Sequence, residues 1–239
     1  ILPGSFEFEP EEATSFELGT KMGILDGAGE LNAAIFYTKF DDLQVSVFDG
    51  TLGFNVGNAA SAISKGVEFD GRVALSEHWL LAGGLSILSF EYEDHLAGTC
   101  TQGQTPTSPD GISCDYSGKT GQYVADYSGN ILLSYENYVF GDLIFRANLD
   151  TLFTDDYNPS PNLDPAVAQD GNVQYNGRIG LSAQDGTWDV ALVGKNLSDE
   201  LVLAYTQDLP SAYTITQAET HFGFVAPRRT ISLQASYRF

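Results

Sequence analysis

The sequence predicts an all-β membrane protein built from about nine antiparallel strands in up-and-down order. Three observations support this fold class: apolar and polar residues alternate along the chain, short and long connections alternate, and aromatic residues gather near strand ends. The chain has 239 residues, of which 43% are hydrophobic and 12% aromatic. That composition excludes a disordered chain and suffices for one sizeable domain or one membrane barrel.

Alternation is clearest in the last segment, where apolar side chains occupy every second position from Ile231 to Phe239. A strand separates this pattern onto two faces, whereas a helix, with a period of about 3.6 residues, does not. The pattern recurs in segments 15–24, 67–75, 128–135, 142–149 and 188–193, while in 30–40 and 80–90 both faces carry apolar residues. Each strand is expected to have the roughly 9–11 residues that a tilted membrane-spanning strand requires.

The predicted connections fall into two kinds. Short turns are expected at 25–29, 76–78, 136–138 and 184–187, and long loops near 49–59, 94–125, 155–173 and 205–227. Because the two kinds alternate, an up-and-down sheet places every short turn at one end and every long loop at the other. This asymmetry is typical of outer-membrane barrels, which have short periplasmic turns and longer extracellular loops. No helix is expected.

A soluble β-sandwich or barrel would show the same alternation, with one face on a core and the other in water. The membrane interpretation is favoured because Glu68, Asp70 and Arg72 share one strand face, which suits a wet lumen. Aromatic residues at strand ends are also typical of the two interfacial girdles of a membrane barrel. They are Tyr37, Phe40, Phe90, Tyr92, Phe153, Tyr175, Trp188, Tyr205 and Tyr237.

The composition argues against one class of binding partner and against membrane-spanning helices. Asp and Glu number 32 against 11 Lys and Arg, for a net charge of −21, so nucleic acid is not an expected partner. No stretch approaches the ~18 consecutive apolar residues of a helical membrane span. The sequence starts at Ile1 without a visible leader. We therefore expect that processing has removed the start or that the chain is a piece of something longer.

Cys100 and Cys114 are the only cysteines, and they lie in a polar loop far from CxxC spacing. This arrangement predicts a disulfide formed in an oxidising compartment rather than a metal site. The bridge would close a loop of about 15 residues and pin it, with a stabilisation on the order of 3 kcal/mol in the chain-entropy model.

No catalytic site is expected in this chain. The histidines, His78, His95 and His221, lie in or near predicted turns and loops and show no defensible pattern of nucleophile, base and orienting group. Residues 117–120 (Ser-Gly-Lys-Thr) resemble the end of a phosphate-binding loop, but Ser113 stands where the leading glycine would be. We predict a protein that is not an enzyme and that has no cofactor.

Five parts of the chain, in order, resemble the C-terminal part of the β-barrel of a TonB-dependent outer-membrane receptor. They are 8–11 with 15–21, 31–37 with 42–45, 58–60 with 65–69, 194–200 and 227–239. Residues 196–200 (Asn-Leu-Ser-Asp-Glu) are similar to the signature of that family's penultimate strand. Tyr237 and Phe239 resemble the terminal signal that the barrel-assembly machinery reads, although Phe239 would also serve as one more lipid-facing aromatic.

The resemblance implies that residues 1–239 are the C-terminal portion of a barrel of about 22 strands, without a separate second domain. In such a receptor a scarce nutrient (a siderophore, vitamin, haem or glycan) binds outside, and the TonB complex supplies energy through an N-terminal plug. The plug and the remaining strands are absent from this sequence. They are therefore expected partners, together with the lipid of a Gram-negative outer membrane, the barrel-assembly machinery and, through the plug, the TonB complex.

Strand parity supports the same interpretation. Nine antiparallel strands leave the first and last running in the same direction, whereas closed single-chain bacterial barrels have an even number of strands. An open edge in lipid would leave backbone N–H and C=O groups unpaired, at a cost of roughly several kcal/mol for each group. We expect an incomplete part of a larger barrel.

Contacts to a cargo are expected from the long loops, at Tyr157, Asn158, Tyr213 and Phe222. These loops are acidic, and weak Ca²⁺ binding is a further hypothesis; solvated loops are the simpler interpretation, and no metal site is predicted. Two alternatives stay open: a self-contained small porin or adhesin-like barrel, and a soluble secreted β-sandwich that binds a partner. The sequence does not identify the cargo.

Overall fold

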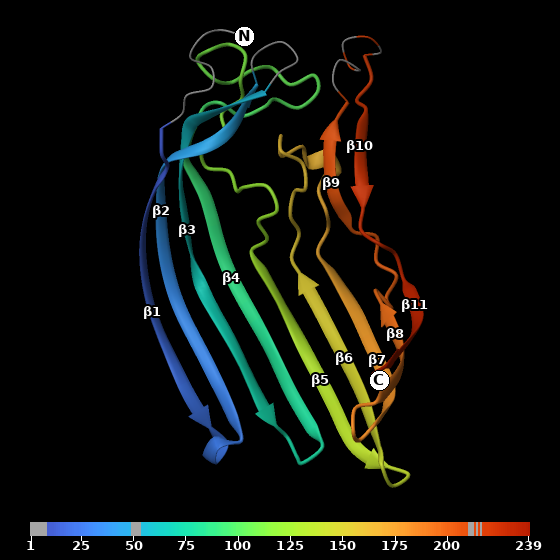
Figure 1. Cartoon of the computed structure of the whole chain (residues 1–239). Coiled ribbons are helices and arrows are strands. Elements are labelled where there is room, and N and C mark those ends of the chain that lie inside the picture. Colours follow the sequence, from blue (N-terminus) through green and yellow to red (C-terminus); the bar gives the residue numbers. More distant parts are fainter. Residues whose placement is uncertain (1–8, 49–53, 210–212, 214, 216) are drawn as a thin grey trace.

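The computed structural model describes residues 9–48, 54–209, 213, 215 and 217–239. It contains eleven strands: β1 (Glu12–Ile24), β2 (Gly29–Phe48), β3 (Phe54–Ala74), β4 (Trp79–His95), β5 (Tyr127–Val139), β6 (Leu143–Thr154), β7 (Asn172–Ala183), β8 (Trp188–Lys195), β9 (Leu203–Asp208), β10 (His221–Val225) and β11 (Thr230–Tyr237). Nine of them form one antiparallel sheet in the order β1 to β8 followed by β11, and β9 pairs with β10 in a separate hairpin (Figure 1). The prediction of about nine up-and-down strands is confirmed.

The alternation of the sequence becomes two distinct faces of the sheet, because residues paired across antiparallel strands lie on the same face. One ladder runs Leu18, Ile35, Val67, Ile87 and Tyr127 across five strands. The adjacent ladder carries small and polar residues, Gly19, Ala34, Glu68, Ser86 and Ser128. The apolar and polar stripes of each strand thus extend across neighbouring strands as continuous surfaces.

The polar face is cross-linked between neighbouring strands. The Asn32 side-chain amide donates to Asp70 at 2.8 Å, and Arg72 forms an ion pair with Glu30 at 2.9 Å. Glu68 accepts the hydroxyl of Ser86 on β4 at 3.5 Å. The stripe of Glu68, Asp70 and Arg72 therefore lies on the face opposite Phe69 and contacts polar partners on β2 and β4, as predicted for the wet side of the sheet. We call the nine-stranded sheet the wall.

The connections follow the predicted asymmetry, with the long loops at one end of the wall and the short turns at the other (Figure 1). One turn is misplaced: the chain reverses at Phe140, Gly141 and Asp142, whereas 136–138 belong to β5. Phe140 and Gly141 have φ angles of 52° and 86°, the left-handed region that glycine accepts without strain. Glu136 instead forms an ion pair with Arg146 of β6 at 2.6 Å.

Two predicted loops contain regular structure. β2 and β3 have 20 and 21 residues, twice the expected length, so residues 54–59 of the predicted 49–59 loop belong to β3, while 49–53 lie outside the described residues. The predicted loop 205–227 contains most of the β9–β10 hairpin. No helix among the described residues is long and apolar enough to cross a membrane. Leu25–Gly27 and Pro165–Val167 are short 3-10 turns.

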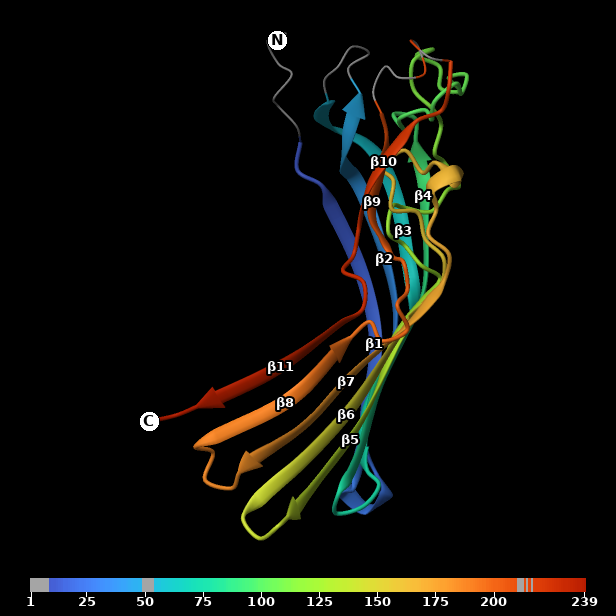
Figure 2. The same cartoon turned by 90° about the vertical axis from the view of Figure 1, so that its right-hand side faces the viewer.

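The sheet is open within the described part of the chain. β1 pairs only with β2 and β11 only with β8, and the two edge strands run in the same direction. Figure 2 shows the wall as a strongly twisted, curved sheet whose β8–β11 end swings away from the β1–β4 end. This open geometry is what parity predicts for part of a larger barrel.

Candidate functional site

The long connections form a folded structure at one end of the wall, which we call the outer cap. It consists of loop 96–126, loop 155–171 and the β9–β10 hairpin (Figure 1). Its interior is buried: the largest fully buried side chains among the described residues are Pro159, Cys114 and Ser160, and all three belong to the cap. The candidate site is therefore built from buried polar groups rather than from loose loops.

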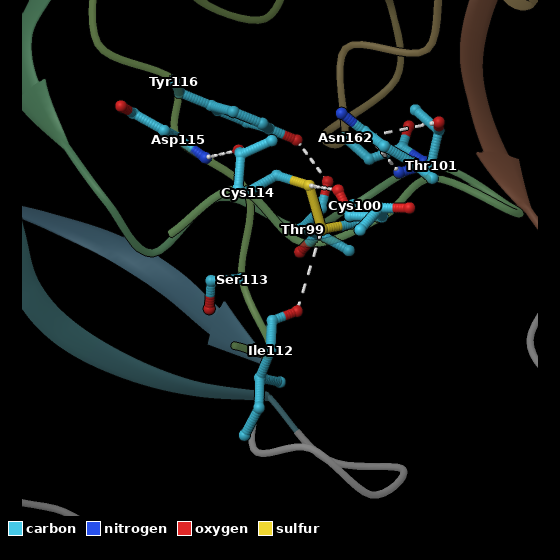
Figure 3. Close-up of a disulfide and its surroundings, with 12 residues drawn as sticks. Thr99, Cys100, Thr101, Ile112, Ser113, Cys114, Asp115, Tyr116 and Asn162 are labelled. Carbon is cyan, nitrogen blue, oxygen red and sulfur yellow. Dashed lines mark hydrogen bonds between the residues drawn. A yellow bond between two sulfur atoms is a disulfide. The ribbon is translucent and has the colours of Figure 1, made fainter. Parts of the chain in front are cut away.

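Loop 96–126 is pinned by the predicted disulfide between Cys100 and Cys114 (Figure 3). Backbone hydrogen bonds pair Gly98 with Cys114 in both directions, at 2.8 and 3.0 Å. The buried Tyr116 lies over Gly98 so closely that a Cβ there would be 2.4 Å from the ring, and its hydroxyl donates to the Thr99 carbonyl. Glycine is required at position 98 because the aromatic ring occupies the space of a side chain.

His95 ends β4 beneath this loop. Its ring packs between Tyr92 and Tyr116, with centroid distances of 4.7 and 5.2 Å. Burial lowers the pKa of His95, against the smaller opposing effect of Asp115 and Asp94. The imidazole therefore packs between two aromatic rings at the base of the cap.

In loop 155–171 every second residue from 160 to 164 is a buried polar one: Ser160, Asn162 and Asp164. Asp164 caps the short turn Pro165–Val167: its Oδ1 accepts the backbone N–H of Ala166 at 2.8 Å. Asp before Pro is a favoured start for a helical turn, because the carboxylate accepts an otherwise unpaired backbone N–H. This hydrogen bond fixes the Asp164 carboxyl group through Oδ1 and leaves its second oxygen, Oδ2, available for another partner.

The β9–β10 hairpin places Asp208 directly opposite His221 in its register. Paired residues of an antiparallel hairpin project from the same face, so the carboxylate and the imidazole lie together. The hairpin is fastened to loop 155–171, because the Leu203 N–H donates to Gln169 Oε1 at 2.7 Å and the Tyr157 hydroxyl donates to the Leu203 carbonyl at 3.4 Å.

These segments converge on one cluster of three titratable side chains. His221 Nε2 lies 2.9 Å from Asp164 Oδ2 and 3.4 Å from Asp208 Oδ1. One ligand atom from each residue falls within 4.8 Å of the others. Asp208 Oδ2 accepts the Gln102 backbone N–H at 2.9 Å and the Asn162 amide at 2.8 Å, which brings loop 96–126 into the same cluster.

The cluster brings two carboxyl groups close together in a largely buried setting. Burial, and next the charge of the nearby Asp164, raises the pKa of Asp208, while the Gln102 N–H and His221 act in the opposite direction. Asp208 Oδ1 is inaccessible to solvent and has no hydrogen-bond partner. A buried carboxylate oxygen without a donor is costly, so this oxygen lacks the partner its environment demands.

The four predicted cargo contacts all lie in the cap but do not form one site. Asn158 is held within its loop, because its amide donates to the Asp164 carbonyl at 2.8 Å and its oxygen accepts the Ser160 N–H at 2.9 Å. Tyr157 is half-buried against the hairpin, and Tyr213 lies beside Gly103 of the disulfide loop. Phe222 projects from the opposite face of the hairpin to His221.

Phe222 belongs to an exposed aromatic cluster. Tyr205, Phe222 and Phe224 have ring centroids 6.3–6.4 Å apart, and Phe224 is 64% exposed. Lower on the wall, a shallow hollow of about 380 Å³ lies between β5, β6 and β7, lined partly by Asn130, Asn172 and Gln174. The first surface offers aromatic contacts, and the hollow offers both polar and apolar ones, since Leu152 and Phe153 also line it.

Sequence reasoning missed the Asp164–Asp208–His221 cluster and the role of Gln102. The sequence places Asp164 and Asp208 in acidic long loops and His221 in or near another loop position, and nothing in it brings the three together. The signal that could have found the pair is the alternating segment 203–208 facing 221–225, which predicts a hairpin with Asp208 opposite His221 once it is interpreted as two strands.

Comparison with known proteins gives one family. A family model described as "TonB dependent receptor-like, beta-barrel" matches residues 3–197. The protein named "Probable TonB-dependent siderophore receptor PiuA" of Acinetobacter baumannii is 33% identical over 97 residues, which cover 39% of this chain and 12% of that protein.

Solved structures share the fold. The ferric yersiniabactin uptake receptor FyuA of Yersinia pestis aligns with a TM-score of 0.71 at 17% identity, over 94% of this chain and 29% of that one. The siderophore receptor PiuA of Acinetobacter baumannii aligns with a TM-score of 0.68 at 21% identity, over 98% of this chain and 29% of that one. The chain therefore spans less than a third of the length of these relatives.

Proposed function

Since the chain belongs to the TonB-dependent receptor family, we propose that it forms part of a Gram-negative outer-membrane receptor that imports a ferric siderophore with energy from the TonB complex. The observation that carries the proposal is the two-faced wall with its outer cap: an apolar face for lipid, a polar face for the lumen, and a folded cap above them. The relatives named as siderophore receptors support the substrate class.

The negative charge of the cap limits the net charge of the ferric chelates that we expect it to bind. Across the three cap segments, 96–126, 155–171 and 203–225, Lys119 is the only lysine or arginine, among many aspartates. A surface of one sign repels ligands of the same sign and lowers their encounter rate. The proposed cargo is therefore a neutral or cationic ferric chelate rather than a polyanionic one.

The aromatic cluster of Tyr205, Phe222 and Phe224 supplies the proposed first contact. Its rings are spaced for edge and offset packing, and ring contacts of this kind contribute roughly 0.5–1.5 kcal/mol beyond area burial. A chelate that carries aromatic rings would gain most from this surface. Substitution at Phe222 and Phe224 together is expected to weaken cargo binding about tenfold, by the loss of about 1.4 kcal/mol.

The test is iron uptake in cells that lack the gene encoding this chain. Iron-limited cells are given radiolabelled ferric chelates that differ in net charge, with and without a functional TonB complex. Uptake of a neutral or cationic chelate should depend on both the gene and TonB. Uptake that persists without TonB would favour the passive-porin alternative, and uptake that is independent of the gene would overturn the proposal.

The variant Phe222→Ala/Phe224→Ala should reduce this uptake, mainly through a higher KM. The matched control is Phe140→Ala, which removes an aromatic residue that is 90% exposed in a short turn at the opposite end of the wall. Equal losses in the two variants would show that the hairpin cluster makes no specific contact with cargo.

A further inference from the structure

We propose that Asp164, Asp208 and His221 bind one resident divalent transition-metal ion of the Zn²⁺ class, which fastens the β9–β10 hairpin to loop 155–171. The ligands come from separate segments: Asp164 from the loop, and Asp208 and His221 from the two strands of the hairpin. An ion at their meeting point would join segments that are otherwise held by a few hydrogen bonds. The ion is a structural clamp and not the imported cargo.

The ligand geometry is close to that of a metal site. In a tetrahedral zinc site with bonds of about 2.1 Å, two ligand atoms lie about 3.4 Å apart. His221 Nε2 lies 2.9 Å from Asp164 Oδ2 and 3.4 Å from Asp208 Oδ1. The remaining pair of ligand atoms falls within 4.8 Å, so small side-chain rotations complete the site and leave a fourth position for water.

The outer oxygens of the two carboxylates are already held. Asp164 Oδ1 accepts the Ala166 N–H, and Asp208 Oδ2 accepts the Gln102 N–H and the Asn162 amide. Each aspartate therefore presents its other oxygen inward to the cluster. This division of labour, with one oxygen oriented by protein donors and one free to bind, is typical of metal-ligating carboxylates.

A proton on His221 does not satisfy the cluster as well as an ion does. Nε2 carries at most one hydrogen, and Asp164 Oδ2 at 2.9 Å is the nearer acceptor. Asp208 Oδ1 is then left buried without a hydrogen-bond donor. A divalent cation would contact both inward oxygens and the neutral imidazole at once, and it would balance the two negative charges.

The donor set selects the class of ion. One imidazole nitrogen with two carboxylate oxygens suits Zn²⁺ and its neighbours, whereas Ca²⁺ and Mg²⁺ prefer oxygen donors alone and higher coordination numbers. Of the acidic residues in loop 155–171, only Asp164 joins this cluster; Asp156 is exposed. The structure therefore favours this site over the Ca²⁺ hypothesis for the acidic loops.

The test is metal titration of the protein from the complete gene, purified in detergent and stripped with a chelator. Calorimetry with Zn²⁺ should give one ion per chain, and excess Ca²⁺ should not compete. Co²⁺ should give the intense visible absorption of a four-coordinate site. No Zn²⁺ binding by the wild-type protein, or a weak octahedral Co²⁺ spectrum, would overturn the proposal without recourse to any variant.

Variants then locate the ion. Asp208→Asn and His221→Gln should each lower Zn²⁺ affinity by at least about 100-fold, because each removes one of three protein ligands. Asp156→Asn and His78→Gln are the matched controls and should bind like wild type. Wild-type affinity in both cluster variants would place the ion elsewhere and refute the assignment. Because the readout is metal binding, the result is independent of whether the receptor imports a siderophore.

Discussion

The wall and the outer cap differ in how far apart in the sequence their contacting residues lie. In the wall, more of the neighbouring strands are joined by short turns than by long loops, and most strands repeat the same two-residue pattern on their own. In the cap, the decisive contacts join distant residues: Gln102 bonds to Thr220 across 118 positions, and Asp164 meets His221 across 57. A periodic surface can be predicted locally, whereas a packed polar junction depends on how several segments come together.

The two regions also bury different chemistry. On the wall, large apolar residues such as Ile131 and Ile179 are about half exposed on the open sheet, as expected for a surface that meets lipid. In the cap, Ser160, Asn162 and Asp164 are buried and hydrogen-bonded to one another or to their neighbours. The apolar face of the wall needs a covering from outside the described chain, for which we propose lipid, while the cap supplies its own interior.

The largest predicted effect tests the lipid-facing side of the wall. Ile131→Arg places a charge near the middle of β5 and should destabilise the folded receptor by about 2–4 kcal/mol. Its neighbour Asn130 lies on the polar face, in register with Gly84 of β4, so Asn130→Arg is the control and should have little effect. Unfolding in lipid vesicles measures both, and equal losses would contradict the assignment of the faces.

The second prediction concerns the cap alone. The double variant Cys100→Ser/Cys114→Ser should lower the stability of loop 96–126 by on the order of 3 kcal/mol, because the open loop gains conformational entropy. Hydrogen exchange should rise in this loop and leave the amides of β5 and β6 unchanged. A reducing agent should reproduce the effect in the wild type and do nothing further to the variant. Faster exchange throughout the wall would show that the two regions are not separable.

The third prediction tests the junction between cap segments. The Gln102 side chain donates to the Thr220 carbonyl at 2.6 Å and accepts the Thr220 N–H at 2.8 Å. Gln102→Ala leaves the Thr220 N–H unpaired, while the Thr220 carbonyl still accepts the Leu209 N–H at 2.8 Å. The change should cost about 1–3 kcal/mol of local stability. Gln104→Ala is the control, since Gln104 bonds only locally to Thr101. Hydrogen exchange at Thr220 should increase in the first variant and not in the second.

Much of the wall could be predicted from the sequence, and the reasons are visible at single residues. The alternation of Asn130 and Ile131 reports which face each occupies, because strand geometry imposes a period of two. The turn at Phe140 was misplaced because Glu136 and Asn137 look like turn residues, while their pairing with Arg146 and Phe145 depends on the neighbouring strand. Pairing between strands is information that one strand does not carry.

The cap could be predicted only where one covalent bond or one pattern was decisive. The disulfide was predicted because the chain has just two cysteines. The Asp164–Asp208–His221 cluster was not, because it requires the β9–β10 register, the capped turn at Pro165 and the packing of the two together. Asn158 illustrates the same limit: its loop position predicts cargo contact, and that stays a prediction, whereas its hydrogen bonds to Ser160 and Asp164 follow only from the folded loop.

The smallest predicted effect lies where cap and wall join, at Asp199 after β8. Arg228 donates to both carboxylate oxygens at 3.1 Å and the Arg229 N–H donates at 3.0 Å. These bonds lower the pKa of Asp199 to about 2 from the ordinary 3.8. Because the folded-state pKa is the lower one, the ionised carboxylate stabilises the fold above pH ~4, and this stabilisation is lost as the pH falls through about 2.

Asp199→Asn should therefore lower the Tm of the purified protein modestly at pH 7, and the difference from wild type should shrink between pH 4 and pH 2. The effect is small because the arginines are exposed and water competes for the pair. Asp156→Asn, an exposed aspartate of loop 155–171, is the control and should follow the wild-type pH profile. A Tm difference that is constant down to pH 2 would show that the side-chain shape of Asp199, rather than its charge, joins the end of β8 to the start of β11.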